Sequence, residues 1–149
     1  MEKLNLPEYI FRYKEEKGKK FIFDEVRGKF VALTPEEWVR QNFLRFMADQ
    51  LNYPKALTGV EKMLKVHGLS QRCDILLYNR RGSPAMVVEC KAPGVSVDSK
   101  TMAQAARYNT TLKVPFLVLT NGQKHYCIQT DTETGDFEAL SEFPAFEEL

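Results

Sequence analysis

The sequence predicts a single mixed α/β domain, and three observations support this fold class. Two stretches carry apolar side chains at helical spacing, whereas other short stretches are rich in aliphatic residues and bounded by turn residues. In order, these segments are a helix, three strands, a second helix and two strands. The chain has 149 residues, with 44% hydrophobic and 28% charged residues, which suits one soluble domain with one core.

The N-terminal third contains a small β extension and the start of the first helix. Residues 15–20 form a charged turn within residues 1–33, and the sequence FIFDEVRGKFVAL around it indicates two short strands. Thr34 can cap a helix, Pro35 suits its first position, and Glu37 completes a capping box. Apolar residues at helical spacing carry this helix to about Leu51.

The remaining elements follow from alternating or continuous aliphatic runs and the turns between them. Asn121-Gly122 is a tight-turn signal, and the acidic residues 131–149 are expected to form a C-terminal tail. The predicted strands are residues 60–66, 73–78, 85–91, 114–120 and 124–129, with a helix from residue 98 or 99 to residue 112.

Composition excludes several classes of protein. No apolar run is long enough to cross a bilayer and no signal peptide is evident, so we expect a cytoplasmic protein without a membrane partner. Three cysteines without a CxxC pair, and only two histidines, argue against a disulfide scaffold or a thiolate zinc site.

Charge is unevenly distributed although the net charge is only +1. Residues 72–113 hold seven Lys/Arg against three Asp/Glu, whereas residues 131–149 hold seven acids and no base. The basic stretch is a candidate phosphate-contacting surface, and ordinary solvated faces are the alternative. Its candidate DNA contacts are Arg72, Arg80, Arg81, Lys100 and Arg107.

Two carboxylates and a lysine form the candidate site. Glu89 and Lys91 lie on one face of a strand, and Asp74 lies opposite Glu89 if the hairpin is symmetric about residues 81–82. Carboxylates this close repel each other unless one is protonated or a cation lies between them. Mg²⁺ fits this site, with the Cys90 carbonyl as a further oxygen ligand, and Lys91 could then hold the nucleophilic water.

The second helix places two more polar side chains near this site. Gln104 and Tyr108 are four residues apart and share one helix face. If the alanines around them allow close approach to the sheet, Gln104 could fix a metal-bound water or Glu89. Tyr108 could then bind a phosphate oxygen.

These residues resemble the PD-(D/E)xK nuclease superfamily. The pattern is Asp74, fifteen residues, Glu89-Cys90-Lys91, then Gln104-x-x-x-Tyr108. With TPEEWVRQNFLRFM and PFLVLTNGQKHYC, it is similar to the N-terminal nuclease domain of type I restriction enzyme R subunits, including short stand-alone relatives. The resemblance spans about residues 34–130, and Cys73 stands where the motif name has proline.

The resemblance implies a restriction-endonuclease-like core with a central mixed sheet and Mg²⁺-dependent hydrolysis of DNA, with Mn²⁺ as a substitute. It also implies a helix acid at the site, for which Glu37 is the first choice and Glu36 the reserve. The near-neutral charge and the lack of a recognisable specificity element favour dependence on a protein partner, and a homodimer is the other candidate because double-strand cutting needs two sites. The alternatives are a non-catalytic nucleic-acid-binding or assembly module, and a protein with a merely structural Asp–Glu–Lys cluster.

Overall fold

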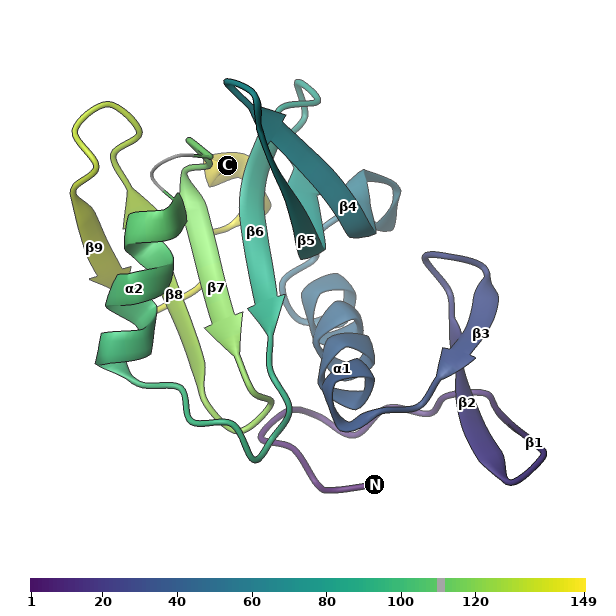
Figure 1. Cartoon of the computed structure of the whole chain (residues 1–149). Coiled ribbons are helices and arrows are strands. Elements are labelled where there is room, and N and C mark those ends of the chain that lie inside the picture. The colour runs from purple at the N-terminus through teal and green to yellow at the C-terminus, as the bar shows by residue number, and fades with distance from the viewer. Residues whose placement is uncertain (110–111) are drawn as a thin grey trace.

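The computed structural model describes residues 1–109 and 112–149, without the side chain of Tyr108. Within these residues the chain folds into two sheets and two α-helices (Figure 1). The helices are α1 (Pro35–Asp49) and α2 (Ser99–Asn109), with short 3-10 helices at Lys55–Leu57 and Phe146–Glu148. The strands are β1 (Tyr13–Glu16), β2 (Lys19–Asp24), β3 (Lys29–Ala32), β4 (Thr58–Val66), β5 (Leu69–Tyr78), β6 (Pro84–Cys90), β7 (Phe116–Thr120), β8 (His125–Thr130) and β9 (Phe137–Leu140).

The larger sheet confirms the predicted mixed α/β class. Its six strands follow the order β4-β5-β6-β7-β8-β9, and every described neighbouring pair is antiparallel except β6 and β7. A parallel pair needs a crossover connection, and α2 lies in the segment that joins β6 to β7. No helix of the described residues is long and apolar enough to cross a membrane.

The sheet is buried on both faces because its side chains alternate between two apolar clusters. Ile75, Leu77 and Val88 belong to the cluster that contains residues of α1, such as Val39 and Phe43. The cluster on the α2 side contains the neighbouring strand residues Leu76, Val87 and Leu117, together with Met102 and Ala106 of α2. Each helix therefore covers one face, α1 against β5 and β6 and α2 against β7 and β8.

The start of α1 forms as predicted, but the expected capping box is only half present. The Thr34 hydroxyl accepts a hydrogen bond from the backbone N–H of Glu37 at 3.0 Å. The Glu37 carboxylate bonds Arg27, Arg40 and Gln41, rather than turning back to the cap. The helix ends at Asp49, two residues before the expected end.

The two ends of the chain differ most from expectation. β1 occupies part of the predicted charged turn, and the three-stranded sheet β1-β2-β3 stands beside the main body in Figure 1. The expected acidic tail contains β9, which pairs with β8. Phe146 is buried in the α1-side core, and the Tyr53 hydroxyl donates to the Pro144 carbonyl at 2.7 Å. Sparse apolar residues in an acidic stretch were therefore enough to fix this segment.

The N-terminal residues pack against the turn between β7 and β8, where a glycine allows close contact. The turn between β7 and β8 contains Gly122 at φ +85°, in the left-handed region, as the Asn-Gly signal predicts. A β-carbon on Gly122 would lie 2.7 Å from a methyl carbon of Leu4. Asn5 N–H donates to the Gly122 carbonyl at 2.8 Å, so the absence of a side chain allows the N-terminal segment to dock.

The buried C-terminal aromatic provides a test of this arrangement. We expect Phe146→Ala to lower the free energy of unfolding by about 3 kcal/mol, because it removes a buried ring from the core. Phe137→Ala is the matched control, since the Phe137 side chain lies in β9 and is 43% exposed. Urea denaturation of both variants measures the difference, and equal losses would show that residues 141–149 do not stabilise the fold.

Candidate metal site

The β5–β6 hairpin has the predicted register. Ile75 pairs with Val88 and Leu77 with Met86, and a shift near the loop sets Tyr78 against Pro84. Continuing the register by one residue sets Asp74 opposite Glu89, where regular pairing stops. The two carboxylates therefore come from directly facing positions on adjacent strands.

The sheet opens at Asp74 on both sides. Toward β6, the Asp74 carboxylate accepts a hydrogen bond from the backbone N–H of Cys90 at 2.7 Å, in place of a backbone acceptor. Toward β4, pairing is interrupted between Val60↔Ile75 and Lys62↔Cys73. Glu61 fills this gap with φ +57°, a left-handed conformation that is rare for a residue with a side chain. Asp74 therefore has a regular strand partner on neither side, which leaves polar groups beside it.

The pKa values of the two carboxyl groups are both raised. Burial raises the pKa of Asp74 above its ordinary value, against the opposing effects of the Cys90 N–H and the Arg40 charge. Burial also raises the pKa of Glu89, and the Asp74 charge adds to the effect while Lys91 opposes it. A cation between two such groups would favour their charged forms.

The donor set fits a hard divalent cation. The Gln71 side chain lowers the pKa of Glu89 somewhat, and its buried Oε1 has no hydrogen-bond partner among the described residues. A water bound to a cation could donate to that oxygen. Burial raises the pKa of the Cys73 thiol to about 11, so it remains protonated and is a poor ligand. Two carboxylates with waters match Mg²⁺, which needs no larger cluster of acids.

In the part of the chain that the structure describes, neither Lys91 nor Gln104 forms a hydrogen bond or ion pair with the carboxylates of the site. The Lys91 side chain is exposed, and within the described residues it takes part in no ion pair. Gln104 is also exposed on α2. The side chain of Tyr108 lies outside the described part of the chain, so the predicted Gln104–Tyr108 pair has only its helical backbone positions here.

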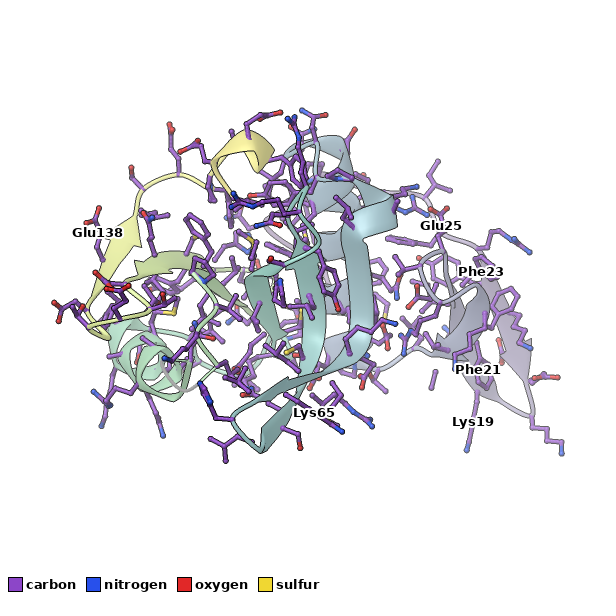
Figure 2. All side chains as sticks on the ribbon, turned by 90° about the horizontal axis from the view of Figure 1, so that it is seen from above. Lys19, Phe21, Phe23, Glu25, Lys65 and Glu138 are labelled. Carbon is purple, nitrogen blue, oxygen red and sulfur yellow. The ribbon has the colours of Figure 1, made fainter. Side chains whose placement is uncertain are left out.

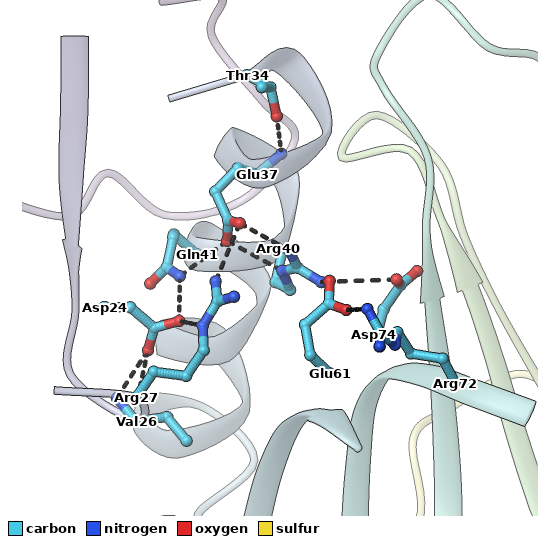
Figure 3. A network of polar contacts seen from close by, with 10 residues as sticks. All are labelled: Asp24, Val26, Arg27, Thr34, Glu37, Arg40, Gln41, Glu61, Arg72 and Asp74. Carbon is cyan, nitrogen blue, oxygen red and sulfur yellow. Dashed lines mark hydrogen bonds and ion pairs between the residues drawn. The ribbon is translucent and has the colours of Figure 1, made fainter. Parts of the chain in front are cut away.

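The first choice for the helix acid is engaged elsewhere. Glu37 is buried and bonds Arg40 at 2.6 Å and Arg27 at 3.0 Å (Figure 3). Burial would raise the pKa of Glu37, but these hydrogen bonds outweigh it and lower the pKa. Glu36 is exposed, and its pKa is raised by burial and then by the Asp74 charge, while Lys91 lowers it. Glu36, the reserve, is thus the helix glutamate whose pKa responds to the charges of Asp74 and Lys91.

Arg40 connects this site to the rest of the molecule. Its side chain is 7% exposed and pairs with Glu61 at 2.7 Å and Asp74 at 3.5 Å (Figure 3). Burial disfavours its charge, but Glu37 and Glu61 more than compensate and raise its pKa. Glu61 also pairs with Arg72 at 3.3 Å, so a charged chain runs from α1 to β5.

The structure separates the predicted basic residues. Arg72 is 66% exposed on β5, close to Asp74 in sequence and in the network. Arg80 and Arg81 lie in the loop before β6, at the opposite end of that strand from Glu89, about 17 Å away along it. Arg80 pairs there with Glu147 at 3.7 Å. Lys100 and Arg107 are exposed on α2, so the five residues do not form one surface around the carboxylates.

Three residues of the site were not expected from the sequence. Arg40 follows Glu37 at a spacing of three on the helix, which is a recognisable ion-pair signal. Glu61 and Gln71 gave no such signal, because Glu61 lies at a local interruption of the β4–β5 pairing and the extension of β5 to Leu69 brings in Gln71.

Comparison with known proteins links this chain to restriction enzymes. Residues 35–144 match the family described as the type I restriction enzyme R protein N terminus. A solved fragment assigned as the HsdR subunit of a type I restriction enzyme from Vibrio vulnificus YJ016 is 26% identical, with a TM-score of 0.55. That similarity covers 78% of this chain and 24% of that chain, so this chain matches about a quarter of the solved fragment. No curated protein matches the chain.

The raised pKa values predict how neutral variants behave. A carboxyl whose pKa is raised by folding binds its proton more tightly in the native state, so stability falls as pH rises above the unfolded pKa. Without added metal, Asp74→Asn and Glu89→Gln should therefore raise Tm at pH 8. This gain in Tm should disappear near pH 4, because below that pH the wild-type carboxyls are largely protonated in both the folded and the unfolded protein.

Glu142→Gln, at an exposed position of the C-terminal segment, is the control and should change Tm little at either pH. Thermal unfolding followed by circular dichroism measures all three variants. A lower Tm at pH 8 for both site variants would contradict the predicted direction.

The buried arginine provides a second test. Arg40→Met should destabilise the protein by about 3–5 kcal/mol, because it leaves the buried Glu37 without its closest cation. Arg72→Met removes an exposed partner of Glu61 and should cost less than about 1 kcal/mol. Similar values from urea denaturation would show that the network does not depend on Arg40.

Proposed function

The chain belongs to the family of the type I restriction enzyme R protein N terminus, and we propose that it is a Mg²⁺-dependent nuclease that hydrolyses phosphodiester bonds in DNA. The proposal includes a restriction-endonuclease-like core for the six-stranded sheet. The observation that carries it is the pair of Asp74 and Glu89, half-buried with raised pKa values where β5 and β6 stop pairing, with Lys91 next but one to Glu89.

Asp74, Glu89 and the carbonyl of Cys90 would hold the cation. Bound there, Mg²⁺, or Mn²⁺ in its place, would neutralise charge that develops on the phosphate and favour ionisation of a water. The Lys91 ammonium is exposed and outside the described ion pairs, so it can orient the attacking water and stabilise the transition state electrostatically. Gln71 can position a water through its unpaired oxygen.

We assign the helix acid to Glu36 rather than Glu37. Glu36 responds to the charges of Asp74 and Lys91, whereas both oxygens of Glu37 bond arginine side chains. In this proposal Glu36 contributes a third carboxylate from the side of α1, and Glu37 holds Arg40 in place. Gln104 and Tyr108 stay supporting residues of the proposal.

One observation favours a second candidate function, a non-catalytic nucleic-acid-binding or assembly module. The Arg40 guanidinium lies 3.5 Å from Asp74 and already supplies a positive charge there. In a non-catalytic protein that kept the fold, this ion pair could neutralise Asp74 in place of a metal. From the restriction-enzyme family we propose DNA as the substrate, and either a further protein or a second copy as a partner.

Metal binding and cleavage should separate the roles of these residues. We expect calorimetry to detect Mg²⁺ binding by the wild type, and Asp74→Asn to weaken it at least about tenfold, because a ligand charge is lost. Lys91→Met should leave Mg²⁺ binding nearly unchanged but slow plasmid cleavage by about 100-fold or more, since it removes a group that acts in the transition state.

Paired helix variants complete this test. Glu36→Gln should slow cleavage without destabilising the protein, whereas Glu37→Gln should mainly lower Tm because it loosens the buried arginines. Glu142→Gln is the control for a lost surface charge. Absence of Mg²⁺ and Mn²⁺ binding, even with DNA present, would reject the nuclease and favour the non-catalytic module.

A further inference from the structure

The three-stranded sheet presents an aromatic and basic face that the candidate metal site does not use. Directly paired residues of antiparallel strands share a face, and Lys14 pairs with Phe21, Glu16 with Lys19 and Phe23 with Phe30. Arg12 also lies beside Phe23, whose N–H donates to the Arg12 carbonyl. We call this set the aromatic face: Arg12, Lys14, Glu16, Lys19, Phe21, Phe23 and Phe30.

Its rings are only partly covered, and cations cover them. Phe21, Phe23 and Phe30 are half-buried. The Arg12 guanidinium lies 4.4 Å from the centre of the Phe23 ring, and the Lys14 ammonium lies 5.0 Å from that of Phe30. Phe23 and Phe30 meet edge to face with their centres 5.1 Å apart. Figure 2 shows Lys19, Phe21 and Phe23 on this outlying sheet, away from the main body.

The opposite face accounts for the attachment of this sheet to the domain. Ile22 and Asp24 are fully buried there, and Gln41 of α1 donates to Asp24 at 2.9 Å. Packing against α1 therefore explains Ile22 but not the three phenylalanines. Arg12 and Lys14 cover only part of these rings, and leaving the rest in water on an unpartnered face is unfavourable unless a ligand covers it.

The charged residues of the aromatic face indicate what kind of ligand would cover the phenylalanine rings. The aromatic face has three cations, Arg12, Lys14 and Lys19, and one acid, Glu16, which pairs with Lys14 at 3.3 Å. An anionic partner with flat apolar groups satisfies both the cations and the rings. Unpaired bases on a phosphate backbone have this chemistry, since they stack on aromatic side chains while Lys and Arg contact phosphates.

We propose that the aromatic face binds single-stranded nucleic acid. Bases stack on Phe21 and on the Phe23–Phe30 pair, and Arg12, Lys14 and Lys19 contact the phosphates. The Phe23 end of the face leads toward the metal site, because Asp24 and Arg27 follow it and Arg27 pairs with Glu37, which holds Arg40 beside Asp74. The binding itself does not rest on the cleavage reaction.

Fluorescence anisotropy with the full chain in EDTA tests the binding without hydrolysis. The probe is a fluorescein-labelled oligothymidylate of about 20 nucleotides, enough to cross the face. Phe21→Leu keeps an apolar side chain but removes the ring, and should weaken binding at least about fivefold. An oligouridylate of the same length distinguishes RNA from DNA, and binding of either supports the proposal.

Two charge variants on the same sheet provide the matched control. The double variant Lys14→Ala/Lys19→Ala removes two cations from the aromatic face. It should reduce the slope of log Kd against log salt concentration by about 1.4. Lys20→Ala with Lys29→Ala removes two exposed cations from the other face and should change it little. Circular dichroism and Tm confirm that each variant folds.

Several results would overturn the proposal. They are absence of oligonucleotide binding, equal effects of the two double variants, or binding unaffected by Phe21→Leu. A dimer detected by light scattering and dissociated by Phe21→Leu would show that the face binds a second copy instead. Capture of an acidic peptide that the oligonucleotide does not displace would assign the face to a protein partner.

Discussion

The buried guanidinium of Arg40 has to be neutralised on every side, and this requirement holds the parts of the molecule together. A charge that is 7% exposed is tolerated only when several oxygens surround it. Glu37 supplies them from its own helix, while Glu61 and Asp74 supply them from β4 and β5. Through Glu37 the same network reaches the turn after β2, so the helix, the small sheet and the candidate site share one set of ion pairs.

The same residue shapes the chemistry of the site. Its positive charge lowers the pKa of Asp74, while burial and the other acids raise it. A metal bound at Asp74, as proposed, would act on the same carboxylate as Arg40 and in the same direction. The site can keep two carboxylates at the opening of the sheet before a cation binds, because Arg40 and Lys91 offset part of their repulsion.

The elements that could be predicted are those with strong local signals. The hairpin register followed from Asp74 and Glu89 flanking a short turn, and the start of α1 followed from Thr34 and Pro35. The sequence could not separate the two adjacent glutamates, because a helix rotates about 100° per residue and both suit a first turn. Only the structure shows that Glu37 is bonded to Arg27 and Arg40. Likewise, Phe146 and β9 are fixed by distant partners, which composition alone does not indicate.

The hairpin that carries the two carboxylates also has a consequence for folding kinetics. Residues 79–83 alone close β5 onto β6, whereas the parallel pairing of β6 with β7 requires closure of residues 91–115. Short closures cost less chain entropy and are made sooner. The two acids are thus brought face to face by one of the most local contacts of the sheet. The repulsion between the two carboxylates therefore arises as soon as this hairpin closes, whether or not the second helix is in place.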